Sequence, residues 1–330
     1  MTKPLLSIRD LKIEFATRSG RVTALNGIDL DLLPGETLGI VGESGCGKSL
    51  TALAMMGLVP DPPGRITGGS IVFDGEDMTR ANAKRLRSLR GADISMVFQE
   101  PMTSLNPVFT VGDQIAEAIM QHQSTSNAEA GRIAVELLRT VGIPEPQRRS
   151  QSYPHELSGG MRQRVMIAIA ISCRPRILIA DEPTTALDVT VQAQIFDLMR
   201  DIQQQFGVAV VLITHDMGAI AEMADRVAVM YAGRIVETGN ADAILDNPLH
   251  PYTHGLIGCI PVLGKLASRE GRMPPLVEIP GIVPPLHLLG AGCAFADRCP
   301  LAFDRCRAET PILEGDVHKV ACFAVEMEAV

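Results

Sequence analysis

The sequence predicts an α/β fold built on a largely parallel sheet. Four short apolar runs, at residues 38–41, 177–180, 208–213 and 227–231, have the composition of strands that are buried on both faces. Segments with helical spacing separate them, and a glycine-rich turn follows the first run. Strands that alternate with helices in this way are typical of α/β domains.

The bulk composition is that of a globular protein with an aliphatic core. The chain has 330 residues, of which 46% are hydrophobic, 21% charged and only 4% aromatic. This length allows one large domain and a smaller appendage. The net charge of −8 gives no support to a nucleic-acid partner, because phosphate backbones are held by Lys and Arg patches.

No segment has the length of a membrane span. The longest apolar run, Val165–Cys173, is about half of the ~18 residues that a spanning helix needs. The N-terminal residues also lack the apolar stretch of a signal peptide. We therefore expect a cytosolic chain, to which another subunit supplies any membrane part.

The pattern along the chain divides it into two parts. Residues 8–32 alternate apolar and polar positions, which predicts strands with one buried face. A helix is expected at 49–56, and helical spacing dominates between about 106 and 156. Beyond 247 the composition shifts to Pro, Gly and Cys. These changes predict a first domain at 1–246, with a helical subdomain at about 100–160, and a C-terminal extension at 247–330.

A phosphate-binding loop follows the first buried strand. The segment matches the pattern G-x-x-x-x-G-K-S/T, in which glycines turn backbone N–H groups toward phosphates at a helix N-terminus. Lys48 is expected to reach the β- and γ-phosphates, and the Ser49 hydroxyl to bind Mg²⁺. No chemistry is assigned to the Cys46 side chain, which we expect to pack. The predicted ATP-binding residues of the loop are Gly42, Glu43, Ser44, Gly45, Cys46, Gly47, Lys48 and Ser49.

Carboxylates and a histidine follow the later buried strands. The strand at 177–180 runs into Asp181 and Glu182, and the strand at 208–213 runs toward His215. The carboxyl ends of parallel strands form one edge of a sheet, where ligands bind. We expect Asp181 to hold Mg²⁺, Glu182 to polarise the attacking water, and His215 to contact the γ-phosphate.

A second phosphate-binding helix end is indicated at Leu157-Ser-Gly-Gly-Met161. Ser158 is a good N-cap, and Gly159 and Gly160 leave the first N–H groups of the helix accessible to a phosphate. The chain's own loop already serves its own nucleotide. This helix end is therefore expected to serve a nucleotide held by another subunit.

With these elements the sequence resembles the ATP-binding-cassette (ABC) ATPase family over residues 5 to about 245. The resemblance implies that Gln99 is the Q-loop residue, with a part in Mg²⁺ binding and catalysis, and that 186–188 form the D-loop. Phe15 is the candidate for stacking on adenine, with an ordinary core role as the alternative. Met161 departs from the family's usual Gln. The family implies a sandwich dimer that ATP closes and hydrolysis opens.

Two further segments resemble the dipeptide, oligopeptide and nickel permease ATPases. They are 97–107, around the Q-loop, and 247–253, at the start of the extension. The resemblance implies a peripheral subunit on the cytoplasmic face of the inner membrane. Its implied partners are a second similar ATPase, two transmembrane permease subunits and, indirectly, a solute-binding protein. Di- and oligopeptides are the expected cargo, with nickel or glutathione as the alternatives.

Four cysteines near the C-terminus indicate a metal site, namely Cys293, Cys299, Cys306 and Cys322. Zinc and an iron–sulfur cluster both accept four thiolates. Zinc sites favour pairs two to four residues apart, which are absent here, and Cys299 precedes a proline as cluster ligands often do. The subfamily resemblance also points to a 4Fe-4S cluster, which we favour over zinc. Cys173 and Cys259 are expected to be packing residues.

Two other classes of protein agree less well with the sequence. A soluble ABC ATPase that acts on nucleic acid or the ribosome would need a coiled-coil insertion, a second cassette or a strongly basic surface. A redox enzyme would need a flavin or nicotinamide motif beside the cysteines. The sequence shows none of these features.

Overall fold

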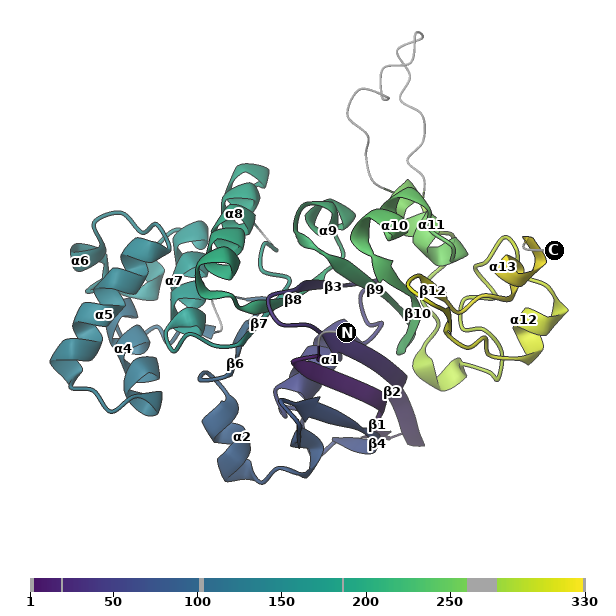
Figure 1. Cartoon of the computed structure of the whole chain (residues 1–330), viewed down its shortest axis with the longest axis horizontal. Coiled ribbons are helices and arrows are strands. Elements are labelled where there is room, and N and C mark those ends of the chain that lie inside the picture. The colour runs from purple at the N-terminus through teal and green to yellow at the C-terminus, as the bar shows by residue number, and fades with distance from the viewer. Residues whose placement is uncertain (1–2, 19, 101–103, 186, 260–277, 329–330) are drawn as a thin grey trace, which may run out of the picture.

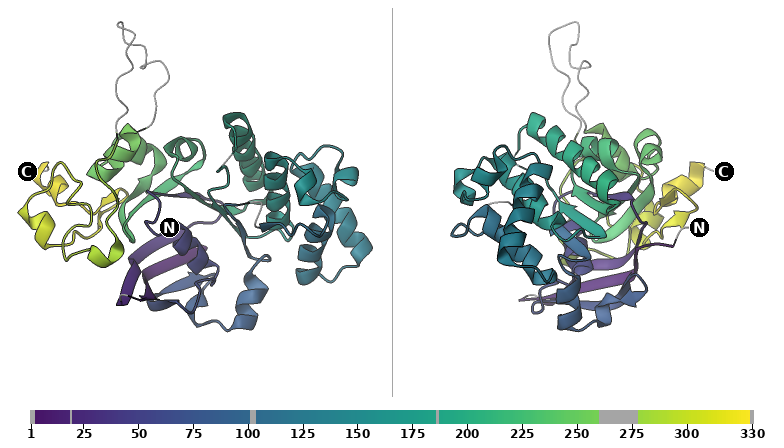
Figure 2. Two further views of the ribbon diagram at one scale, coloured as in Figure 1. Left: turned by 180° about the vertical axis from the view of Figure 1, so that it is seen from behind. Right: turned by 60° about the vertical axis from the view of Figure 1, so that its left-hand side comes forward.

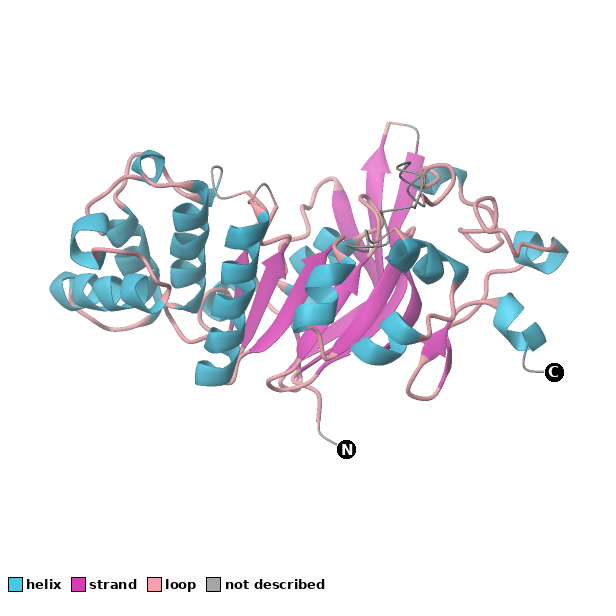
Figure 3. Cartoon of the chain, turned by 90° about the horizontal axis from the view of Figure 1, so that it is seen from above, coloured by secondary structure: helices cyan, strands magenta, loops and turns pink. Residues whose placement is uncertain are grey.

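The structure is a computed structural model that describes residues 3–18, 20–100, 104–185, 187–259 and 278–328. It is an α/β fold with a large sheet at its centre and a smaller antiparallel sheet beside it. A lobe of helices and the C-terminal extension lie at opposite ends of the molecule (Figures 1 and 3). The view from behind shows the same separation (Figure 2).

The large sheet contains the four predicted buried strands. Its strands are β3 (Thr37–Val41), β6 (Ile94–Val97), β7 (Ile177–Asp181), β8 (Ala209–Thr214), β9 (Arg226–Tyr231), β10 (Arg234–Asn240), β11 (Glu314–Gly315) and β12 (Lys319–Val320). Their order is β11-β12-β10-β9-β3-β8-β7-β6. The five strands from β9 to β6 are parallel, and the other three pair antiparallel. Every residue of β3, β7 and β8 is buried, which explains their continuous apolar runs.

The alternating N-terminal segment supplies two strands of the smaller sheet, and residues 64–77, for which no strand was expected, supply the other two. This sheet consists of β1 (Leu6–Thr17), β2 (Gly20–Leu32), β4 (Gly64–Phe73) and β5 (Glu76–Asp77), in the order β2-β1-β4-β5. Helix α1 (Lys48–Met55) contributes Ala52 and Met55 to the core that this sheet shares with Ile40 of β3. The helix that follows the phosphate-binding loop is therefore held by both sheets.

Helices α8 (Val189–Phe206), α9 (Met217–Met223) and α10 (Ala241–Asp246) cover one face of the large sheet, and α4 (Val111–His122), α5 (Asn127–Thr140), α6 (Pro146–Arg149) and α7 (Gly159–Ile171) form the lobe (Figure 1). The short helices η1 (Met78–Arg80) and α2 (Ala83–Leu89) pack with the smaller sheet on the other face. Helices α4, α5, α7 and α8 each begin after an N-cap side chain that accepts a backbone N–H, which satisfies donors that the helix leaves free. The apolar positions Val111, Ile115 and Ile119 are fully buried, as helical spacing predicts. A further short helix, η2 (Pro154–Glu156), precedes α7.

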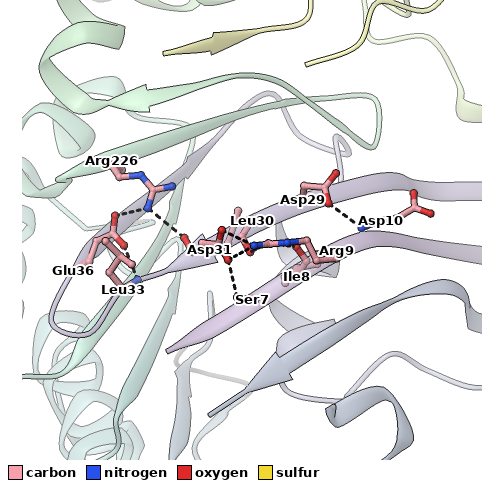
Figure 4. Close-up of polar contacts among 10 residues, drawn as sticks. All are labelled: Ser7, Ile8, Arg9, Asp10, Asp29, Leu30, Asp31, Leu33, Glu36 and Arg226. Carbon is pink, nitrogen blue, oxygen red and sulfur yellow. Dashed lines mark hydrogen bonds and ion pairs between the residues drawn. The ribbon is translucent and has the colours of Figure 1, made fainter. Parts of the chain in front are cut away.

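Charged side chains join the two sheets near the end of β2 (Figure 4). Arg226 of β9 donates to Glu36 Oε1 at 2.9 Å and to the Asp31 carbonyl oxygen at 3.4 Å. Arg9 of β1 donates to both carboxylate oxygens of Asp31, at 2.8 and 2.7 Å. Burial acts to raise the pKa of Asp31, but hydrogen bonds from Arg9 and Ser7 outweigh it, so this pKa is lowered. The smaller sheet is thus fixed in orientation against the larger one.

The extension docks through a hairpin and a buried carboxylate. Strand β12 pairs with β10, so the β11–β12 hairpin continues the large sheet. The carboxylate of Glu237, which is fully buried, accepts the backbone N–H of Leu249 (2.7 Å) and of His250 (3.0 Å) and contacts His318 Nε2 (2.7 Å). The extension's helices are α11 (Pro251–Gly258), η3 (Leu286–Leu288), α12 (Asp304–Ala308) and α13 (Phe323–Glu328). Among the described residues, no helix has the length and apolarity of a membrane span.

Candidate active site

The glycine-rich loop connects β3 to α1 and lies close to the neighbouring strand β9. Gly42 has a φ of 152°, and a Cβ on it would lie 2.2 Å from the Met230 carbonyl oxygen, so only glycine fits there. Lys48 Nζ donates to the carbonyl oxygens of Gly42 at 2.7 Å and Glu43 at 3.1 Å. Lys48 is only 5% exposed. Its ammonium group is therefore fixed against the backbone of the loop.

Asp181, the last residue of β7, lies beside the first turn of α1. The Ser49 hydroxyl donates to Asp181 Oδ1 at 3.1 Å. Asp181 is 5% exposed, and this burial raises its pKa, while the hydrogen bond from Ser49 opposes the rise. A carboxylate that is poorly solvated and next to a hydroxyl oxygen is a suitable donor set for Mg²⁺, because the cation favours the ionised form.

Glu182 is the centre of a group of polar side chains. Its Oε2 accepts from Gln99 Nε2 at 2.8 Å and from Thr185 Oγ1 at 3.0 Å, and its Oε1 lies 3.2 Å from His215 Nδ1. Its backbone has a φ of 46°, a conformation uncommon for a residue with a side chain. The Glu182 N–H donates to the carbonyl oxygen of Ile213 in β8 at 2.8 Å, which holds it in this conformation. Such strain is characteristic of functional positions.

Two cavities meet at Glu182. One, of about 260 Å³, is lined by the loop residues Ser44, Gly45, Gly47, Lys48 and Ser49, together with Ala24, Leu50, Gln99, Glu182 and Leu286. The other, of about 390 Å³, includes Glu182, Thr185, His215 and Cys259 in its lining. The contacts of Thr185 and Leu286 were not predicted from the sequence. Thr185 lies three residues after Glu182, so its place near the acidic pair could have been recognised from the sequence. The residues around Leu286 contain no motif that would have indicated its contact with the loop cavity.

The helix end predicted to bind another subunit's nucleotide has the expected N-cap. The Ser158 side chain caps α7 by accepting the Met161 N–H at 3.3 Å. Gly159 and Gly160 are the first two residues of the helix, packed beside Leu187 and the α8 side chain of Val191. None of Ser158, Gly159 and Gly160 is among the described residues that line either cavity. Ala186, a predicted D-loop residue, lies outside the described residues.

Several predicted residues lie elsewhere or behave differently. Phe15 is in β1, and its ring packs so closely on Gly64 that a Cβ there would lie 2.8 Å from the ring. It is absent from the described lining of the loop cavity. Cys46 is a buried core residue whose burial raises its pKa, which agrees with a packing role. Cys173 contacts the Ala118 carbonyl oxygen, whereas Cys259 is exposed, so the expectation that Cys259 packs is wrong.

The four C-terminal cysteines surround one small apolar cavity of about 10 Å³. All four are free thiols, and Cys306 is buried. Burial raises the pKa of Cys293 to about 11 and also raises the pKa of Cys299 and of Cys322. Among the residues that the structure describes, no three His, Cys, Asp or Glu side chains are placed to hold a metal ion. The thiols therefore converge without forming a metal-ligand set in this conformation.

The fold and this site define an ABC ATPase. Residues 25–185 match the ABC transporter family. The structure resembles the dimeric ADP- and phosphate-bound ATP-binding cassette MJ0796, with a TM-score of 0.65 and 26% identity over 72% of this chain and 98% of that one. It also resembles cbiO1 of the cbiONQ transporter from Clostridium perfringens, with a TM-score of 0.63 and 26% identity over 74% and 91% of the two chains.

The C-terminal part narrows the family further. Residues 236–306 match the oligopeptide/dipeptide transporter C-terminal region. The dipeptide transport ATP-binding protein DppD of Bacillus subtilis is 48% identical over 98% of this chain and 96% of its own. The oligopeptide transport protein AppD of the same organism is 48% identical over 98% of each chain, and DppD of Escherichia coli is 50% identical over 94% and 92%. The chain belongs to the ATP-binding proteins of the oligopeptide/dipeptide ABC transporter family.

Proposed function

We propose that this chain hydrolyses ATP to drive the import of di- and oligopeptides. One observation carries the proposal: Glu182 is held by Gln99, Thr185 and His215 at the edge of the phosphate-loop cavity. The peptide cargo is supported by 48–50% identity to peptide-transport ATP-binding proteins along nearly the whole chain.

Each residue of the site has a role in ATP + H₂O → ADP + phosphate. Lys48 and the loop N–H groups bind the β- and γ-phosphates. Ser49, Asp181 and Gln99 would hold Mg²⁺, which neutralises charge on the phosphate oxygens when bound. Glu182 accepts a hydrogen bond from the attacking water and draws its proton, while His215 donates toward the γ-phosphate.

The complete hydrolytic site includes a second ATPase subunit. Ser158, Gly159 and Gly160 present N–H groups at the start of α7, and a nucleotide on the partner's loop is the phosphate that they are placed to bind. The absence of all three from the described lining of the chain's own cavities supports this role. We favour a heterodimer with a similar ATPase, in which each site is completed by the other chain.

An exposed apolar surface supports docking on transmembrane permease subunits. Phe98, next to Gln99, is 42% exposed, and Val108 and Phe109 are 70% and 50% exposed. Exposed apolar side chains on the segment around the Q-loop glutamine are suited to receive an apolar helix of a partner. We therefore place the chain on the cytoplasmic face of the membrane, with the solute-binding protein acting through the permease. Residues 101–103 of the predicted docking segment lie outside the described residues.

The extension at 247–330, beyond the ATPase domain at 1–246, is proposed to hold a 4Fe-4S cluster on its four cysteines, with zinc as the alternative. Four thiolates are a suitable donor set for iron, and all four side chains line one apolar cavity. The cavity of about 10 Å³ must widen to admit a cluster. Anaerobically purified protein should be brown and contain iron and sulfide in equal amounts, and Cys299→Ser with Cys306→Ser should abolish both the colour and the iron content. Zinc without iron would support the alternative, and the absence of both metals would refute the site.

The function is tested with the transporter reconstituted in vesicles. ATPase activity is measured while the solute-binding protein is added with dipeptides, glutathione or nickel. Stimulation by dipeptides alone supports the proposal. Stimulation only by glutathione or nickel would keep the mechanism and change the cargo, and no response to any of them would contradict an import function.

A further inference from the structure

The phosphate-binding loop is held from the C-terminal extension at one residue, Glu43. Arg298 donates to both of its carboxylate oxygens, from Nη1 to Oε2 at 2.6 Å and from Nη2 to Oε1 at 3.0 Å. The Tyr252 hydroxyl accepts the backbone N–H of the same Glu43 at 2.7 Å. These partners lie 255 and 209 residues away in the sequence. Both the side chain and the backbone of one loop residue are therefore fixed by the extension.

Arg298 is itself held firmly. Its side chain is 5% exposed, and its Nε donates to the Pro280 carbonyl oxygen at 2.8 Å. Its guanidinium also donates to the Tyr231 hydroxyl at 3.3 Å and lies over the rings of Tyr231 and Phe295, at 5.8 Å from each centroid. A planar guanidinium with two parallel bonds to a carboxylate fixes direction as well as distance.

The position of Glu43 bears directly on Lys48. The Glu43 carbonyl oxygen is one of the two acceptors of Lys48 Nζ, at 3.1 Å, while the Glu43 N–H is bonded to Tyr252. The N–H of Glu43 is thus anchored to the extension, and its carbonyl oxygen is anchored to the phosphate-binding lysine. In addition, Leu286 of the extension forms part of the wall of the loop cavity.

From these contacts we infer that Arg298 is a positioning residue for ATP binding and that the extension acts as a clamp on the phosphate-binding loop. The inference rests on the proposed ATPase function. Its mechanism is preorganisation: a loop already fixed in its phosphate-binding conformation does not lose conformational freedom when the nucleotide binds. Loosening the clamp is expected to weaken ground-state binding and to leave Glu182 and its contacts in place.

The test is a double-mutant cycle on the full-length chain, using a fluorescent ATP analogue with Mg²⁺. Arg298→Gln and Glu43→Gln should each raise the dissociation constant about tenfold, and the double variant should be no weaker than either single one, because both remove the same contact. In the reconstituted transporter the KM for ATP should rise by a similar factor, with kcat changed less than about twofold. Tyr252→Phe should act in the same direction.

Arg307→Gln is the matched control, because Arg307 pairs with Asp297 on the surface of the same extension. It should leave the dissociation constant unchanged. Glu43→Gln changes a half-buried loop residue, so it remains informative if Arg298→Gln folds poorly. Unchanged affinity in both single variants, or effects that simply add in the double variant, would overturn the clamp. A wild-type chain that binds no nucleotide would instead refute the proposed function.

Discussion

Replacing Glu182 by Gln removes one negative charge and leaves the geometry of the site almost unchanged. The amide oxygen can still accept from Gln99 Nε2 and Thr185 Oγ1, which now donate to a single carboxylate oxygen at 2.8 and 3.0 Å. The amide nitrogen can donate to His215 Nδ1, which lies 3.2 Å from the other oxygen. The backbone bond to Ile213 is independent of the side chain. The substitution therefore isolates the loss of the base.

The expected loss follows from the role of the base. A positioned general base contributes about 10²–10⁴ in rate, so kcat should fall by that factor, equivalent to about 2.7–5.5 kcal/mol in the activation free energy. Affinity for ATP should change less than about threefold, because Lys48 and the loop are untouched. The measurements are steady-state ATPase activity of the reconstituted transporter and binding of a fluorescent ATP analogue to the purified chain.

Glu222→Gln provides the matched control for Glu182→Gln. Glu222 is a surface residue of α9 that pairs with Arg200 at 3.2 Å, and such exposed pairs contribute about 0–1 kcal/mol. Its variant should retain full turnover. If Glu182→Gln hydrolysed ATP within about threefold of the wild-type rate, Glu182 would not be the base and the interpretation of this cluster would be wrong.

Three further predictions concern stability. Burial raises the pKa of Asp181 in the folded state above its ordinary value of 3.8, so the ionised carboxylate costs stability once the pH exceeds the raised pKa. Asp181→Asn should therefore raise the melting temperature of the nucleotide-free chain at pH 7. In scanning fluorimetry the variant should also lose the further rise in melting temperature that Mg²⁺ and ATP cause in the wild type. Gly42→Ala should lower the free energy of unfolding by more than about 3 kcal/mol, because the added Cβ would lie 2.2 Å from a backbone carbonyl oxygen. Gly45→Ala should lower it by only about 1 kcal/mol, because Gly45 has a φ of 79° but open space around it. Both values are measured by urea titration, and equal losses would contradict the steric argument. Glu237→Ala leaves the buried N–H of His250 and the partly buried N–H of Leu249 without their acceptor and should cost about 2–6 kcal/mol. Faster proteolysis of the extension is the check, and unchanged proteolysis would mean that the extension docks by other contacts.

The sequence was informative wherever a feature depends on neighbouring residues. The buried runs appear as β3, β7, β8 and β9, within one residue of the expected bounds for the run at 208–213. Burial on both faces requires continuous apolar residues, and such a run is recognisable without knowledge of its partners. The phosphate-binding loop is also local, because its glycines serve the backbone conformation of the loop itself. The sequence therefore predicted the α/β class and the placement of Glu182 and His215 at one edge of the sheet. The direct contacts of Ser49 with Asp181 and of Glu182 with His215 were found only in the structure.

Contacts between distant segments were not predictable in the same way. Arg298 and Glu43 are separated by 255 residues, and each has an ordinary sequence context for a surface charge. Leu286 is one of many leucines, yet it reaches the wall of the loop cavity. Cys259 could be judged only by composition, which favours burial, whereas its position at the end of α11 leaves it exposed. Tertiary packing decides such positions, and a single sequence carries no record of it.

The registers of three parallel strands explain why the scattered motifs meet. Val41 of β3 pairs with Thr214 of β8, and Asp181 of β7 pairs with Ile213, so the three strands end at the same level. The loop after β3, the acidic pair at the end of β7 and the histidine after β8 consequently emerge at one edge of the sheet. Successive side chains of a strand point to opposite faces, so a slip of one residue between β7 and β8 would turn Asp181 away from Ser49. The buried runs of the large sheet thus contribute to catalysis as directly as the motifs do, because they fix the register that brings the motifs together.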